Sequence, residues 1–199
     1  MDEQNDYRSH TVVKRILLLS GQAAGKRSPI SLRMASKDHD PFVRIYELCN
    51  QGKLGAALRI LIDPATCRLR KKFRFDCNHA WYCVGDILFK QRKIEEAGNA
   101  FKKSLRTRLD DIDALMAVGN CYDELRRPRI AERYFQRALD LSPQIKNKKR
   151  QSIMLNLGNS IFDQGQFGRA AGIYKQLLRV RGEIGIRARK NLSIAKNSI

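Results

Sequence analysis

The chain has 199 residues, enough for one or two domains, and its 43% hydrophobic and 30% charged residues are typical of a globular protein with a buried core. It carries 39 Lys and Arg against 20 Asp and Glu, a net charge of +19, which favours an anionic partner or simply a self-repelling surface. No apolar run approaches the ~20 residues of a membrane span, and five cysteines, an odd number, argue against a disulfide framework. We therefore expect a cytoplasmic protein.

Residues 1–39 form a separate, basic N-terminal segment. Thr11 to Leu19 could form a short amphipathic helix, and Gly21 to Ser31 has the composition of a mobile loop. The stretch Gly21–Ser28 is similar to a phosphate-binding P-loop. It has three residues rather than four between its glycines, however, and Arg27 where that motif has Ser or Thr. No nucleotide site is expected here.

Order is predicted to begin at Asp40–Pro41, because Asp is a good N-cap and Pro fits the first position of a helix. Helical spacing of apolar residues follows from Phe42 to Cys49, and a second helix runs from Leu54 to Ile62. The connection to the next helix, residues 64–78, is basic. Its cluster comprises Arg68, Arg70, Lys71, Lys72 and Arg74, and a second basic run spans Lys146–Arg150.

A pattern of bulky and small residues then recurs. A helix capped by Asp76 or Asn78 leads into Trp81 and Gly85, and the same arrangement returns 34 residues later and again 39 residues after that. The five extra residues of the last interval fall in a mostly polar stretch before residue 151, where added loop length costs little. A period near 34 with helix–turn–helix content predicts a helical solenoid. The three copies contain Trp81, Gly85, Ala97 and Phe101; Leu115, Gly119, Ala131 and Phe135; and Met154, Gly158, Ala170 and Tyr174.

The residue types have a physical reason. Small residues at the Gly and Ala positions let two antiparallel helices approach closely, and the bulky residues are expected to fill the space between neighbouring repeats. One repeat cannot bury its apolar face alone, so the repeats must stack. A glycine within a helix costs ~1 kcal/mol relative to Ala, so three glycines at one repeat position indicate tight packing.

Residues 78–182 resemble tetratricopeptide (TPR) repeats on this pattern, and the middle copy matches it down to Pro143. The resemblance implies an all-α, right-handed superhelical solenoid over residues 40–199. Its repeats are 78–111, 112–144 and 151–183, with a degenerate repeat at 40–64 and a capping helix at 184–199. Ile186, Leu192 and Ile194 are available in that helix to cover the core of the last repeat.

The resemblance also implies a peptide-binding concave groove lined by the first helix of each repeat. Asn120 and Asn159 occupy equivalent positions, where an Asn in TPR proteins commonly clamps the ligand backbone, although a solvated Asn would give the same pattern. The apolar groove residues could equally be core. The groove residues predicted in this way are Tyr82, Asp86, Phe89, Asp113, Met116, Asn120, Asp123, Leu155, Asn159 and Phe162.

Charge is sorted by helix. The first helices expected for the second and third repeats contain acidic residues and no Lys or Arg before the turn, whereas the second helices are basic. The groove is then expected to take an apolar or basic peptide, and the outer face and ends an anionic partner, although these charges could also only solvate the helices. The expected anionic-partner contacts are Arg68, Arg70, Lys71, Lys72, Arg74, Arg187, Arg189 and Lys190.

These features favour a non-enzymatic scaffold, adaptor or assembly chaperone that binds a protein or peptide and needs no cofactor. A nucleic-acid-binding helical repeat that uses the basic clusters is the alternative. The carboxylate clamp of chaperone-binding TPRs is only partly matched, by Asn120, Asn156 and Lys190, with Met116 where its first Lys would be. We predict no metal site, because the spacing of Cys67, Cys77, His79 and Cys83 fits no common zinc pattern.

Overall fold

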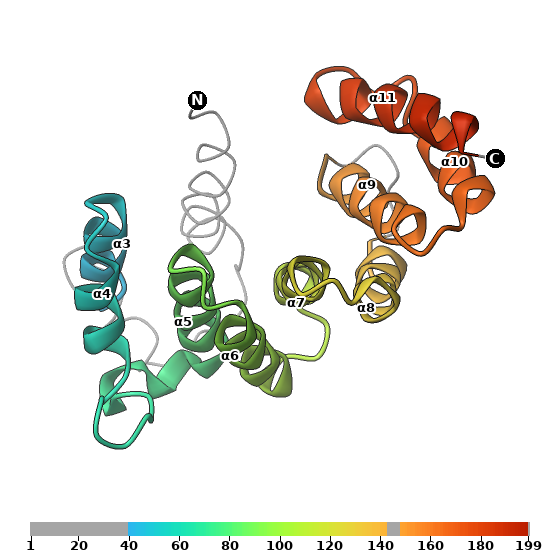
Figure 1. Ribbon diagram of the computed structural model, residues 1–199. Coiled ribbons are helices and arrows are strands. Elements are labelled where there is room, and N and C mark those ends of the chain that lie inside the picture. Colours follow the sequence, from blue (N-terminus) through green and yellow to red (C-terminus); the bar gives the residue numbers. More distant parts are fainter. Residues whose placement is uncertain (1–39, 143–147, 199) are drawn as a thin grey trace, which may run out of the picture. The chain divides into compact units, whose positions relative to one another are not determined.

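The computed structural model describes residues 40–142 and 148–198 (Figure 1). The chain divides into two units, Met1–Asp40 and Pro41–Ile199, and the elements that follow belong to the second. Our expectations for residues 1–39, for Pro143 and for Lys146 lie outside the described residues.

The described chain is all-α, as predicted, apart from an isolated bridge between Ile62 and Leu69. Helices follow one another as pairs, and the second helix of a pair also packs against the first helix of the next (Figure 1). The elements are α3 (Val43–Asn50), α4 (Leu54–Leu61), the 3-10 helix η2 (Lys71–Asp76), α5 (Cys77–Lys90), α6 (Ile94–Thr107), α7 (Ile112–Glu124), α8 (Pro128–Asp140), α9 (Lys148–Phe162), α10 (Phe167–Gln176) and α11 (Glu183–Asn197).

Side-chain caps define two of the helix starts. The carboxylate of Asp76 accepts a hydrogen bond from the backbone N–H of His79 at 3.0 Å, so Asp76 is the N-cap of α5. Asp111 caps α7 by accepting from two backbone N–H groups. The predicted start at Asp40–Pro41 was wrong by two residues, because α3 begins at Val43 with Phe42 as its N-cap.

Each repeat is closed by an aromatic ring that packs on a glycine of the same helix pair. A Cβ added to Gly85, Gly119 or Gly158 would lie 2.6, 2.5 or 2.6 Å from the nearest ring atom of Phe101, Phe135 or Tyr174, respectively. Only glycine leaves room for these rings. The aromatic residues were expected to fill the space between repeats, but the structure places their rings within each helix pair.

The first repeat departs from the pattern through a buried polar pair. Ser104 stands where the pattern has Ala, and its hydroxyl donates to the carbonyl oxygen of Asn78 at 2.8 Å. The Asn78 side-chain amide donates in return to the Ser104 hydroxyl at 2.9 Å. Buried polar groups are costly unless hydrogen-bonded, so the Ser104 hydroxyl and the Asn78 amide nitrogen compensate each other.

Helix α11 packs through small side chains rather than large ones. Its buried residues are Gly185, Ala188, Leu192 and Ala195. Leu192 covers the last repeat as predicted, but Ile186 and Ile194 do not, because they are 59% and 45% exposed. Small residues at helical spacing let α11 lie close to its neighbours, and this contact leaves Ile186 exposed and Ile194 at the edge of the contact.

Candidate functional site

The first helices of successive repeats are joined by polar side chains, and one member of each joined pair belongs to the predicted groove. Asp113 and Asp123 on α7 accept hydrogen bonds from Lys149 at 3.0 Å and from Ser160 at 2.7 Å, both on α9. Asn120 accepts from the amide of Asn156 at 3.1 Å. Predicted ligand contacts are therefore also contacts between repeats.

The same arrangement continues from α9 to α11. The amide of Asn191 donates to the side-chain oxygen of Asn159 at 2.9 Å. Asn159 is the repeat equivalent of Asn120, and Asn191 lies 35 residues after Asn156, close to one repeat period. Helix α11 thus makes the contacts of a first helix of a further repeat.

A hollow of about 260 Å³ opens where α9, α10 and α11 meet. Two predicted groove residues, Asn159 and Phe162, line it, and Phe162 is held by packing of its ring against Phe167 at a centroid distance of 4.9 Å. Sequence reasoning missed the remaining lining residues as groove contacts. These are Asp163, Tyr174, Asn191 and Ile194.

The hydrogen bonds of Asn159 set the chemistry of the hollow. Its side-chain oxygen accepts from the Tyr174 hydroxyl and the Asn191 amide, both at 2.9 Å, which uses both lone pairs. In the described part of the chain, the Asn159 amide nitrogen and the Asn191 oxygen make no recorded hydrogen bond. A donor on Asn159 and an acceptor on Asn191 therefore remain available on two residues that line the hollow.

Burial raises the pKa values of two ionisable groups in this hydrogen-bonded arrangement, Tyr174 on α10 and Asp123 on α7. Burial raises the pKa of Tyr174 to about 12, against the opposing hydrogen bond with Asn191, so the hydroxyl stays protonated as a donor. Burial raises the pKa of Asp123 to about 6, against the hydrogen bond from Ser160, and the nearby charges of Asp163 and Glu124 add to the rise.

Other predicted groove residues are less available to a ligand. Leu155 is 2% exposed and belongs to the core, because its side of α9 packs against neighbouring helices. The ring of Tyr82 packs against Phe101 at a centroid distance of 5.3 Å. Met116 and Phe89 are half-buried and pack on the core.

The groove-facing residues of the first helices, which we call the inner line, are less acidic than predicted. Asp86 forms an ion pair with Lys90 at 2.9 Å, and Asp113 forms one with Lys149 at 2.8 Å. The expectation of no Lys or Arg on the first helix of the third repeat was wrong, because α9 begins at Lys148 rather than at residue 151. The earlier start brings Lys149 onto Asp113.

The basic clusters predicted to contact an anionic partner are exposed. Arg68, Lys71 and Lys72 lie on the connection and η2 before α5, whereas Arg187, Arg189 and Lys190 lie on α11. Some of these arginines also bind backbone. Arg70 and Arg74 donate to the carbonyl oxygens of Arg59 and Leu69, and Arg189 donates to that of Leu178.

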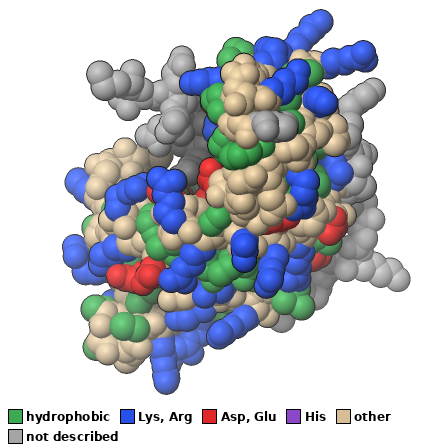
Figure 2. Space-filling model, turned by 45° about the vertical axis from the view of Figure 1, so that its right-hand side comes forward, with side chains coloured by type: hydrophobic (Ala, Val, Ile, Leu, Met, Phe, Trp, Pro, Cys, Tyr) green, Lys and Arg blue, Asp and Glu red, His purple; other side chains and the backbone are tan. Residues whose placement is uncertain are grey.

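Lys and Arg also cover the face of the molecule drawn in Figure 2, where acidic side chains are few. Arg150, from the second basic run, serves the fold instead, because it donates to the carbonyl oxygens of Leu139 and Ser142 at the end of α8.

No metal cluster forms among the described residues. The His79 imidazole contacts the Tyr46 hydroxyl and lies 3.5 Å from the sulfur of Cys83. Cys77 instead donates to the carbonyl oxygen of Arg74, and Cys67 is exposed. Burial raises the pKa of Cys83 above its usual value, which keeps the thiol protonated and unreactive.

The repeated glycine–aromatic closure and the helix pairs agree with a family comparison. A family model for the tetratricopeptide repeat matches residues 85–145 and 119–182. The chain belongs to the TPR family. No helix among the described residues has the length and apolar character needed to cross a membrane.

Known proteins similar to this TPR chain include the mouse protein O-mannosyl-transferase TMTC3, 31% identical over 111 residues. That match covers 51% of this chain but only 12% of the length of TMTC3. Two solved TPR structures share the fold. The first TPR of Spaghetti (RPAP3) bound to an HSP90 peptide has a TM-score of 0.55 and 17% identity and covers 61% of this chain and 91% of that one. YrrB, described as having an unusual peptide-binding site, has a TM-score of 0.60 and 18% identity and covers 85% and 83%.

Proposed function

We propose that the chain is a non-enzymatic protein-interaction scaffold, acting as an adaptor or assembly chaperone, and that the hollow between α9 and α11 binds an extended segment of a partner protein. The observation that carries the proposal is the pairing of Asn159 with Asn191, which leaves an amide donor on Asn159 and a carbonyl acceptor on Asn191 at the hollow. Every residue of an extended peptide presents the complementary C=O and N–H groups. The pair can therefore bind the peptide backbone whatever its sequence.

The rest of the hollow selects the side chain. Phe162 and Ile194 provide apolar walls, and a volume of about 260 Å³ suits one side chain of the peptide rather than a whole ligand. Asp163 is exposed at the same hollow and attracts a cation. We therefore expect the peptide to carry an apolar residue next to Lys or Arg.

The acidic peptide SRMEEVD in the Spaghetti structure is a different kind of ligand. In this chain Met116 replaces a clamp Lys, and Asn120 and Asn156 are hydrogen-bonded to each other at 3.1 Å. These differences support an apolar or basic peptide over an acidic C-terminus.

The test is selection of random peptides displayed on phage against the full chain. Ile194→Asp places a charge in the hollow, and Ile186→Asp is its matched control on the exposed side of α11 away from the hollow. Enriched peptides should carry an apolar residue beside Lys or Arg, and should lose binding to Ile194→Asp but keep binding to Ile186→Asp. Equal binding to both variants would reject the α9–α11 hollow as the site.

The exposed basic clusters support a second contact with an anionic partner. Nucleic-acid binding is the alternative function of these clusters. A salt titration against DNA and RNA distinguishes it from binding of an anionic protein. Phosphate contacts on duplex DNA lower the logarithm of affinity with a slope of roughly −0.9 per phosphate against the logarithm of salt concentration. Absence of binding at moderate salt would exclude it.

A further inference from the structure

A row of three arginines runs along the exposed side of α8. Arg129, Arg133 and Arg137 are spaced four residues apart, so their Cα atoms are separated by ~6 Å along the helix. They line an open hollow of about 510 Å³ on the second helix of the middle repeat, together with Gln164 from the turn before α10. This surface belongs to neither the α9–α11 hollow nor the two basic clusters predicted from the sequence.

The arginine row is not part of the repeat pattern. When the repeats are aligned on Gly85, Gly119 and Gly158, the equivalent residues of α6 are mixed in charge, and two of the three on α10 are glycines. A Cβ at either glycine would meet nothing within 4 Å, so α10 is bare at these positions. The equivalents are Glu95, Asn99 and Lys103 on α6, and Gly168, Gly172 and Gln176 on α10.

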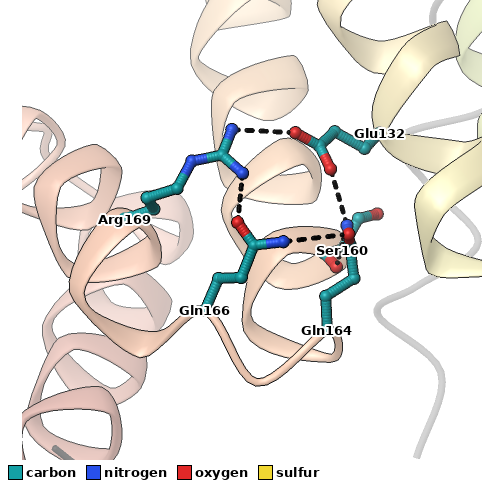
Figure 3. Close-up of polar contacts among 5 residues, drawn as sticks. All are labelled: Glu132, Ser160, Gln164, Gln166 and Arg169. Atoms are coloured by element: carbon teal, nitrogen blue, oxygen red, sulfur yellow. Dashed lines mark hydrogen bonds and ion pairs between the residues drawn. The ribbon is translucent and has the colours of Figure 1, made fainter.

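The acidic residue in the middle of this surface is already engaged by the fold (Figure 3). Glu132 accepts from Arg169 at 2.9 Å and from Gln164 at 2.6 Å. Gln164 in turn donates to the carbonyl oxygen of Ser160 and accepts from Gln166. The charge of Glu132 is thus compensated from α10, and it does not neutralise the arginine row.

The three arginines have no acidic partner in the described part of the chain. Arg137 donates to a neutral carbonyl oxygen, that of Leu109, at 2.7 Å, and the nearby Asp140 accepts from Gln136. Like charges four residues apart on a helix face destabilise the helix. The row therefore costs local stability that no internal ion pair restores.

We propose that the α8 hollow binds an acidic helical segment of a partner protein, with carboxylates one turn apart that face the arginine row. Guanidinium groups bind carboxylates in a bidentate manner, and the ~6 Å spacing repeats on both helices. The carboxylate of Asp140 at one end of the lining disfavours a uniformly charged polyphosphate along the whole row. The lining also contains no aromatic ring on which a base could stack.

The experiment is fluorescence anisotropy with the full chain and an alanine-based helical peptide carrying Glu at every fourth position. A Gln version of the peptide and a single-stranded DNA oligonucleotide serve as comparison probes. Arg129→Glu with Arg133→Glu reverses the charge of two of the three arginines in the row. Lys175→Glu with Arg179→Glu makes the same change of net charge on exposed residues of the third repeat, and circular dichroism checks the fold of both variants.

The Glu peptide should bind, and the Gln peptide should not. The α8 double variant should lose about tenfold in affinity, since two exposed ion pairs with the peptide are replaced by repulsion. The control variant should lose less than about twofold.

Equal losses in both variants would assign the binding to overall charge. Tighter binding of the oligonucleotide, lost in the α8 variant, would assign the hollow to nucleic acid. A dimer in sedimentation equilibrium that the α8 variant abolishes would assign it to a second copy. Each of these three results overturns the proposal. Ile194→Asp should leave binding of the Glu peptide unchanged, so the two proposed sites fail separately.

Discussion

The inner line of first helices and the outer face of α8 use polar side chains in opposite ways. On α7, α9 and α11 several polar residues of the line are bonded to the neighbouring first helix, as in the pairs Asn120–Asn156 and Asn159–Asn191. On α8 the arginines at 129, 133 and 137 have no acidic partner in the described chain. One surface joins the repeats, and the other leaves its charge available.

The difference shows why a repeat position alone does not identify a ligand contact. Asn159 was chosen because its position binds peptide backbone in related proteins, yet its oxygen is fully used by Tyr174 and Asn191. What it offers a ligand is its remaining amide hydrogens. A groove residue in this chain therefore has both a structural and a binding role.

The largest expected effect contrasts a glycine inside a repeat with one on the outer face. Gly119→Ala should destabilise the fold by up to about 2 kcal/mol, because overpacking against Phe135 costs roughly 1–3 kcal/mol and Ala restores ~1 kcal/mol of helix propensity. Gly172→Ala, where a Cβ meets nothing within 4 Å, should instead stabilise by up to ~1 kcal/mol. Urea unfolding of both variants measures the contrast. A change of the same sign at the two positions would disprove the glycine–aromatic closure.

A smaller effect compares hydrogen bonds of the two surfaces. Asn159→Ala should cost about 1 kcal/mol of unfolding free energy, since the Tyr174 hydroxyl and the Asn191 amide both lose an acceptor. Gln136→Ala on α8 removes an exposed bond to Asp140 and should change stability by less than about 0.5 kcal/mol. The same denaturation assay applies. If Asn159→Ala costs no more than Gln136→Ala, the inner bonds do not hold the repeats together.

The features that could be predicted from the sequence are those encoded by local spacing. The 34-residue interval, the small residues at Gly119 and Ala131, and the cap at Asp76 are patterns of size and polarity within one or two helices. They specify the repeats because each repeat packs mainly on itself and its neighbours. The buried pair Asn78–Ser104 explains a mismatch that the pattern alone left unexplained.

The features that were mispredicted depend on contacts between repeats. The start of α9 at Lys148 was hidden by the polar stretch before it, so the ion pair with Asp113 was missed. The orientation of Ile186 and Ile194 was wrong because large apolar residues were preferred over the small ones that form the α11 contact. Asn191 could have been found by extending the repeat period from Asn156.

Asp123 is the carboxylate of the inner line, among the described residues, whose pKa is raised by burial. Since Asp123 has a pKa of about 6 in the fold, above its usual value, the fold favours its protonated form. This contribution to stability is present below the unfolded pKa and is lost as the pH rises through about 6. Asp123→Asn should therefore gain stability relative to the unmodified chain as the pH rises from 4.5 to 7.5, as measured by thermal unfolding at a series of pH values.

Ser160→Ala removes the hydrogen bond that favours the carboxylate, so it should move the pH-dependent loss of stability to higher pH. If the difference between Asp123→Asn and the unmodified chain does not vary with pH, Asp123 is ionised throughout, and the inner line presents a full negative charge to its ligand.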